Sequence, residues 1–184
     1  MVPIASLWLP ILLSAVIVFF VSFVLHSILP FHRSDYGRAQ TEGAALDALR
    51  GTPPGDYLIP HSVGPAAMKD PAYIEKVKRG PIALITVLPS PPPSIAKNLV
   101  QWFVYSLIVG VFAAYIAGRT LGPGAPYSQV FRFVGTTSFA CYGLALPQNS
   151  IWFGKKWSTT FKSLVDSLIY GLLAGGTFGW LWPD

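Results

Sequence analysis

Four apolar segments alternate with polar ones along the chain, and each is long enough to predict a helix that crosses a membrane. Such a helix needs about 20 apolar residues to span roughly 30 Å of hydrocarbon. The third segment is the weakest of the four because it contains Arg132 and several hydroxyl side chains. The predicted transmembrane helices are residues 4–29, 95–118, 127–147 and 157–182.

The polar segment between the first two helices, residues 30–94, is patterned like a small folded unit. Thr41 and Asp70 each stand where they could cap a short helix, and glycine and proline residues separate the pieces. A proline-rich stretch then leads into the second membrane helix. We expect helices over 41–50 and about 70–79, and extended segments over 56–60 and 82–88.

The predicted fold class is therefore an all-α integral membrane protein, a four-transmembrane-helix bundle with a small cytoplasmic αβ appendage between helices one and two. Composition agrees, because 52% of the residues are hydrophobic and only 11% are charged, whereas soluble domains are about one quarter charged. These values exclude a disordered chain, a coiled coil and a nucleic-acid-binding domain. The first apolar run lacks a preceding basic residue and is longer than the apolar core of a signal peptide, which has about 7–15 residues, so it predicts a retained helix.

The basic residues predict the orientation. Of the 13 Lys and Arg, all but Arg119 and Arg132 fall in or beside residues 30–94 and the connection between helices three and four. Basic residues favour the cytoplasmic side, so both termini are expected outside a bacterial inner membrane. Tryptophan and lysine near the ends of the helices are expected at the lipid–water interface: Trp8, Trp102, Trp152, Lys155, Lys156, Trp157, Trp180 and Trp182.

Small residues recur every fourth position in two of the helices, a pattern that lets helix backbones approach closely in lipid. The second helix has Gly110, Ala114 and Gly118, and the fourth has a double G-x-x-x-G motif. These stripes predict helix packing, either within the chain or between two copies of it. The residues of the fourth-helix motif are Gly171, Gly175 and Gly179.

The histidines form one candidate site, because all three fall on the same predicted side of the membrane. His32 and Asp35 are three positions apart and can meet on one turn. Imidazole and carboxylate together bind transition metals, but no H-x-x-x-H or H-E-x-x-H spacing is present. A structural role and a metal site using His26, His32, Asp35 and His61 both stay open, and no cofactor is assigned.

A second candidate site lies on the fourth helix, where Lys162, Asp166 and Tyr170 share one face at four-residue intervals. A charge inside a membrane is costly and marks a candidate functional site. One alternative is a structural pair, in which Asp166 neutralises a Lys162 that reaches toward the membrane surface. The other is a pathway for protons or ions along this face.

Three strings resemble those of small bacterial inner-membrane proteins that carry no assigned activity: residues 32–36 (HRSDY), 150–154 (SIWFG) and 178–183 (FGWLWP). The resemblance extends over most of the chain. It implies a bacterial inner membrane, and it transfers no functional residue.

No nucleotide-binding loop, nucleophile elbow, paired cysteines or paired carboxylates occur in the sequence, so no catalytic residue is assigned. The sequence favours a non-catalytic subunit, assembly factor or scaffold of a larger membrane complex, with lipid and a membrane-protein partner or a second copy as neighbours. One alternative is a small oligomeric channel or transporter using Lys162, Asp166 and Tyr170. Another is a membrane enzyme or metal-binding protein using His26, His32 and Asp35.

Overall fold

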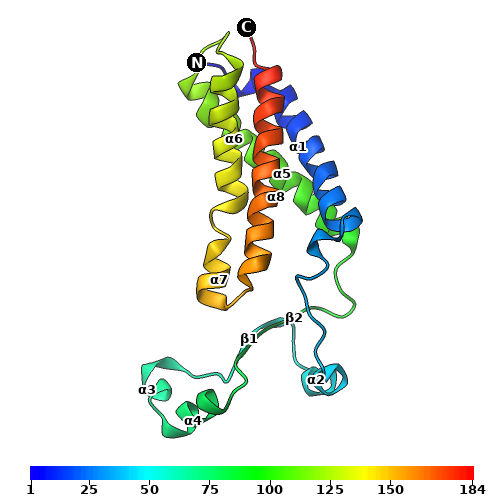
Figure 1. Ribbon diagram of the computed structural model, residues 1–184, viewed down its shortest axis with the longest axis vertical. Helices are drawn as coiled ribbons and strands as arrows, with labels where there is room; N and C mark the ends of the chain where they lie inside the picture. The colour runs from blue at the N-terminus through cyan, green and yellow to red at the C-terminus, as the bar shows by residue number, and fades with distance from the viewer. The chain divides into compact units, whose positions relative to one another are not determined.

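The computed structural model describes residues 1–184 and is mostly helical, with one small two-stranded sheet (Figure 1). The chain divides into two compact units. The first joins Met1–Gly37 to Ile95–Asp184, and the second is Arg38–Ser94. Each unit is described by itself below.

The first unit is a helical bundle in which both chain termini lie at the same end (Figure 1). The amide of Val2 donates to the carbonyl of Gly118 at 2.8 Å, and that of Gly124 donates to Pro183 at 2.9 Å. The first bond holds the N-terminus beside the end of the helix that contains Gly118, and the second holds the C-terminus beside the loop that follows this helix. The helices are α1 (Trp8–Phe23), α5 (Ile95–Thr120), α6 (Tyr127–Gly143), α7 (Pro147–Phe153) and α8 (Trp157–Trp180).

Two helices are long and apolar enough to cross a membrane, judged by length and composition: Ile4–Ile28, which contains α1, and α5. The sequence prediction of four such helices is therefore not supported for α6 and α8. Helix α6 has 17 residues, about 26 Å at 1.5 Å per residue, which is short of the hydrocarbon thickness. Helix α8 has 24 residues but contains Lys162, Asp166 and several hydroxyl side chains, which lower its hydropathy.

The interior of the first unit is unusually rich in polar side chains. Large buried apolar residues such as Leu7, Val130, Val134 and Phe178 form the core. Ten polar or charged residues are also buried, while many large apolar side chains are exposed. The buried polar residues are Ser14, Ser22, Ser106, Ser138, Ser150, Thr159, Thr160, Asp166, Ser167 and Thr177.

Helices α6 and α8 form the closest backbone contact, through the glycine motif of α8. A Cβ atom on Gly171 would lie 2.8 Å from the carbonyl oxygen of Gly135, and one on Gly175 would lie 2.9 Å from that of Phe131. One on Gly179 would lie 2.6 Å from the Tyr127 ring. The motif thus packs within the chain.

Replacing Gly175 with alanine is expected to lower the thermal stability of the detergent-solubilised protein. The new methyl group meets backbone that cannot yield without separating α6 from α8, and such overpacking costs about 1–3 kcal/mol. The neighbouring Gly176 provides a matched control, because a Cβ there makes only an ordinary 3.6 Å contact with Tyr127. Equal melting temperatures for Gly175→Ala and Gly176→Ala would contradict this account.

Helices α1 and α5 also meet through small residues. A Cβ on Gly110 would lie 3.3 Å from the side chain of Ile11, and one on Gly118 would lie 2.6 Å from the carbonyl oxygen of Val2. Ala114, between them, is fully buried. The small-residue stripe of α5 therefore faces α1 and the segment before it.

The predicted interfacial tryptophans separate into two groups. Trp8, Trp152, Trp157 and Trp180 are exposed, as an interfacial position requires. Trp102 and Trp182 are half-buried and bond within the protein. Trp102 donates to Ser22 Oγ at 2.8 Å, and Trp182 donates to the carbonyl of Gly122 at 3.0 Å. Both indoles therefore bond within the bundle, and their place at a lipid–water interface stays a prediction.

The second unit contains no fully buried residue, as expected for a segment too small to form a core. Strands β1 and β2 correspond to the two segments predicted as extended, and they pair antiparallel from Gly55↔Val87 to Ile59↔Ala83. The carboxylate of Asp70 accepts a hydrogen bond from the amide of Ala72 and caps α4. The elements are α2 (Glu42–Leu49), β1 (Gly55–Ile59), α3 (Gly64–Met68), α4 (Pro71–Arg79) and β2 (Ala83–Val87).

Candidate metal centre

A sharp turn after α1 brings two histidines face to face. The residue before a proline is driven into extended backbone, and Leu29, which precedes Pro30, has φ −76° and ψ 143°. The helical path therefore ends at Ile28 and restarts as a short turn over Pro30–His32. The rings of His26 and His32 stack with centroids 4.2 Å apart and planes 6° from parallel.

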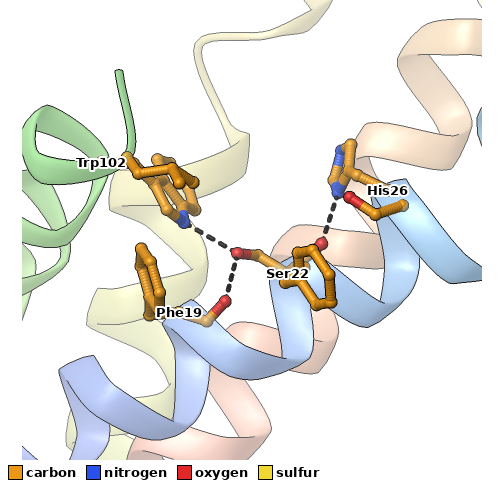
Figure 2. A pocket seen from close by; sticks show the side chains of 7 residues that line it. Phe19, Ser22, His26 and Trp102 are labelled. Atoms are coloured by element: carbon orange, nitrogen blue, oxygen red, sulfur yellow. Dashed lines mark hydrogen bonds between the residues drawn. The ribbon is translucent and has the colours of Figure 1, made fainter. Parts of the chain in front are cut away.

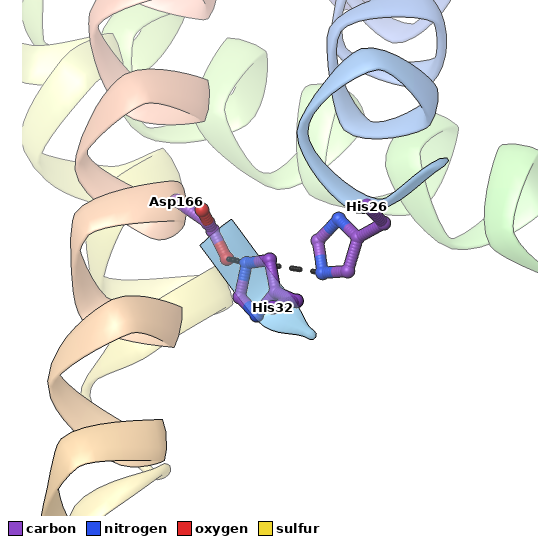
Figure 3. Close-up of side chains that lie close together, drawn as sticks. All are labelled: His26, His32 and Asp166. Carbon is purple, nitrogen blue, oxygen red and sulfur yellow. Dashed lines mark ion pairs between the residues drawn. The ribbon is translucent and has the colours of Figure 1, made fainter. Parts of the chain in front are cut away.

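The carboxylate of Asp166, in the middle of α8, lies against both rings (Figure 3). Its Oδ2 is 2.9 Å from His32 Nε2 and 3.8 Å from His26 Nε2. The three ligating atoms all lie within 4.8 Å of one another. Asp166 and His32 are almost completely enclosed, with side chains 4% and 11% exposed, whereas His26 is 51% exposed. The cluster is thus open only on the side of His26.

Neighbouring acceptors fix the tautomers of both rings. His26 Nδ1 lies 3.0 Å from the carbonyl oxygen of Ser22, which can only accept, so this nitrogen carries the hydrogen. His32 Nδ1 lies 2.7 Å from a carboxylate oxygen of Asp35 and carries the hydrogen for the same reason. In a neutral ring of this tautomer the lone pair is on Nε2, the nitrogen that lies 2.9 Å from Asp166 Oδ2 in His32 and 3.8 Å from it in His26.

The lysine predicted as a partner of Asp166 instead completes a chain behind His32. Lys162 Nζ donates to Asp35 Oδ1 at 2.9 Å and to Ser34 Oγ at 2.8 Å. Burial raises the pKa of Asp35, but the hydrogen bonds from Lys162 and His32 outweigh it and hold this pKa below its ordinary value. Asp35 is therefore a carboxylate that positions His32 rather than a ligand itself.

The remaining predicted site residues lie elsewhere. Tyr170 is buried one turn from Asp166, with its hydroxyl unpartnered, and packs against Tyr142 and Trp102 at centroid distances of 5.3 and 6.0 Å. His61 is an exposed residue of the second unit. Lys162 is thus linked to Asp166 through Asp35 and His32, while Tyr170 packs among aromatic rings one turn further along α8.

The arrangement brings three possible metal ligands, His26, His32 and Asp166, close together. Two atoms bound to one ion at about 2.1 Å can be no more than about 4.2 Å apart, and the two histidine–aspartate distances, 2.9 and 3.8 Å, meet this limit. Because the two rings are stacked almost parallel and a ring nitrogen binds a metal in the plane of its ring, one ring must turn before both histidines bind the same ion. Metal-binding histidines typically donate their other ring nitrogen to a carbonyl or a carboxylate, as His26 and His32 do here. Sequence reasoning proposed the two histidines but missed Asp166 as their partner.

Two buried polar atoms add to this picture. Asp166 Oδ1 is buried without a hydrogen-bond partner, and the buried His32 Nε2 faces only the other oxygen of the same carboxylate, at 2.9 Å. Buried polar atoms are nearly always satisfied, so these two atoms mark a place where a cation would be stabilised.

Comparisons with known proteins suggest no function for this chain, so a functional proposal must rest on the geometry of the site. The expectation of a bacterial inner membrane rests on the three sequence strings given above. The strongest positive observation is the meeting of His26, His32 and Asp166. No family model, no curated protein and no solved structure matches the chain.

Proposed function

We propose that this protein is a helical membrane protein that binds a transition-metal ion through His26, His32 and Asp166. A single observation carries the proposal. His32 Nε2 and Asp166 Oδ2 are 2.9 Å apart, yet the hydrogen bond to Asp35 places the hydrogen of the neutral His32 ring on Nδ1. If the ring is neutral, two lone pairs face each other in a buried site, and a shared cation, either a metal ion or a proton on Nε2, turns this repulsion into attraction.

The donor set indicates which ions fit. Imidazole suits Zn²⁺, Cu²⁺, Fe²⁺ and Ni²⁺, and an added carboxylate is common for zinc and iron. Three protein ligands leave at least one coordination position for another molecule, whereas structural zinc sites use four. The half-exposed ring of His26 puts the open position on its side. The site therefore supports exchange of an external ligand more than a purely structural role.

Apolar side chains on the outside and polar side chains on the inside support a membrane location for α8 as well as for α1 and α5. The outer face of α8 exposes Phe161, Val165, Leu168 and Leu172, while Asp166 is buried on the inner face. Water-soluble helices show the opposite pattern, and large exposed apolar surfaces mark contact with lipid or protein. The most apolar stretches of Ile4–Ile28 and α5 are likewise only 33% and 28% buried.

These observations support the fuller proposal of a four-helix bundle in a bacterial inner membrane with both termini outside. In this arrangement α6 is supported along its length by the glycine face of α8. The basic residues of the segment between α1 and α5 then face the cytoplasm.

A role as a subunit or scaffold of a membrane complex is the second candidate. It is favoured by the outer face of α1, where Trp8, Leu12, Phe20 and Phe23 are exposed and none belongs to the metal cluster. Lipid and a partner helix satisfy such a surface equally well. A channel along Lys162, Asp166 and Tyr170 is less favoured, because Lys162 is engaged by Asp35.

Metal analysis tests the proposed function directly. Protein purified in detergent without chelator and titrated with Zn²⁺ is expected to bind one ion per chain. Because only the folded site binds the ion, a hundredfold excess over the dissociation constant should stabilise the fold by about 2.7 kcal/mol. Addition of EDTA should return the melting temperature to that of the apoprotein. Absence of saturable binding by Zn²⁺, Fe²⁺, Ni²⁺ and Cu²⁺ would overturn the proposal.

A further inference from the structure

An apolar groove between α1 and α5 begins at the metal cluster. Its first part is a pocket of about 260 Å³ with His26 and Ser22 at one side and Phe19, Leu99 and Trp102 around it (Figure 2). A second pocket of about 360 Å³ shares Phe19 and Leu99 with the first. The two pockets therefore adjoin, and together they reach the size of ordinary ligand sites, roughly 300–1,000 Å³.

The groove changes in character along its length. The far pocket is lined only by apolar side chains, among them Val16, Val100 and Phe103. From His26 to Val16 is ten residues along α1 and the helical turn that follows it, Val24–Ile28, about 15 Å at roughly 1.5 Å per residue. A ligand that fills the groove must therefore be an elongated apolar chain with a polar group at the His26 end only.

Three of the four polar side chains that line the first pocket already have partners, and the fourth is the uncharged Ser27. Trp102 Nε1 donates to Ser22 Oγ, which in turn donates to the carbonyl of Phe19 (Figure 2). His26 Nδ1 is held by the carbonyl of Ser22. The metal position next to His26 Nε2 is thus the anchor for a polar head group.

The charge at this anchor selects an anion. A divalent ion next to the carboxylate of Asp166 leaves one net positive charge, since Lys162 and Asp35 neutralise each other. In surroundings of low dielectric constant this charge is compensated best by one negative oxygen ligand.

We propose that the groove binds one long-chain fatty acid, with its carboxylate on the open coordination position of the metal and its acyl chain along α1 and α5. This inference rests on the proposed metal site and names its ligand class. It assigns to Phe19 and Leu99 the role of holding the chain, and to His26 the role of joining the chain site to the metal site.

The test uses spin-labelled stearate as the probe, with the full-length protein in maltoside detergent and in phosphatidylcholine nanodiscs. With Zn²⁺ present, one immobilised stearate per chain is expected in the electron paramagnetic resonance spectrum. Removing Zn²⁺ should weaken binding by at least about tenfold, and unlabelled palmitate should compete at least about tenfold better than hexadecanol. Equal binding with and without the metal, or equal competition by the alcohol, would overturn the proposal.

A groove-filling variant separates this site from general contact with lipid. Leu99→Trp should reduce stearate binding by about tenfold or more while the Zn²⁺ affinity stays unchanged. Ile108→Trp is the matched control, because Ile108 lies on the exposed surface of the same helix and lines neither pocket. If Leu99→Trp lowers the melting temperature, Leu99→Phe repeats the measurement with a smaller side chain. Unchanged stearate binding in a folded Leu99 variant would also overturn the proposal.

The two proposals fail in distinguishable ways. If wild-type protein binds no metal, the proposed function fails and the fatty-acid proposal fails with it. If Zn²⁺ binds with one ion per chain but stearate is not immobilised, only the fatty-acid proposal fails. If a lysophospholipid competes as well as palmitate does, the groove is a site for lipid chains without carboxylate selectivity, and the proposed head-group contact is wrong.

Discussion

Asp166→Asn is expected to weaken Zn²⁺ binding by more than about 100-fold. Losing a residue that only orients a metal ligand costs about 10–100-fold, and Asp166 is a proposed ligand itself. The asparagine keeps the size of the side chain but removes the charge that the two histidines share. Because Asp166 is 4% exposed, no water replaces the lost oxygen ligand easily. Isothermal titration with Zn²⁺ measures the effect.

The stability of the Asp166→Asn apoprotein distinguishes a metal from a proton as the shared cation. If His32 is neutral, the asparagine amide donates to its Nε2, so the apoprotein should melt at the same temperature as wild type or higher. If instead a protonated His32 forms a permanent ion pair with Asp166, the substitution breaks a buried pair, at a cost of about 3–5 kcal/mol. A large loss of apoprotein stability together with unchanged metal affinity would refute the metal centre.

His61→Ala is the matched control for this experiment. His61 is the remaining histidine of the chain and lies in the unit formed by Arg38–Ser94, exposed to solvent. The variant should bind Zn²⁺ as wild type does. His32→Ala should behave like Asp166→Asn in the titration, because it removes the other enclosed ligand.

Lys162→Met is expected to weaken Zn²⁺ binding by about 10–100-fold, as is usual when a group that orients a metal ligand is removed. Lys162 does not touch the proposed metal position. It donates to Asp35 at 2.9 Å, and Asp35 accepts from His32 Nδ1 at 2.7 Å. Without the ammonium group Asp35 is free to turn away, and the hydrogen of the His32 ring is no longer held on Nδ1.

The nitrogen chemical shifts of His32 report this role in the apoprotein. Wild type should show Nδ1 protonated and Nε2 free, whereas Lys162→Met should show a mixture of tautomers. Lys155→Met is the control, because Lys155 is an exposed lysine that precedes α8 and is expected to affect neither the shifts nor the affinity. A Lys162→Met protein with wild-type shifts and wild-type affinity would show that the lysine only neutralises charge.

Local patterns in the sequence were sufficient for several parts of the structure. The contact of His32 with Asp35 is such a case, because residues three apart in one turn meet whatever surrounds them. The two extended segments of the second unit pair as a sheet. The glycine motif of α8 predicted a close helix contact, and the structure shows that this contact is made with α6.

Other local patterns did not decide the contacts because they allowed more than one partner. The four-residue spacing of Lys162 and Asp166 permits a pair along one helix, yet Lys162 bonds to Asp35, 127 positions away. Trp102 near the start of a membrane helix predicted an interfacial residue, and the structure adds a hydrogen bond from its indole to the buried Ser22. In both cases a neighbouring element supplied a partner that the local pattern did not show.

The sequence by itself determined where most of the helices form, where Pro30 ends the first of them, and which small residues let helices approach. These properties follow from hydrophobic periodicity, backbone restriction and side-chain size, all of which act over a few residues. The sequence did not predict α3 or α7, and the third predicted helix, 127–147, ends at Gly143. Only the tertiary structure decided that Asp166 meets His26 and His32. The packing of α8 against α1 and the turn after it joins parts of the chain far apart in sequence, and no local pattern encodes that distance.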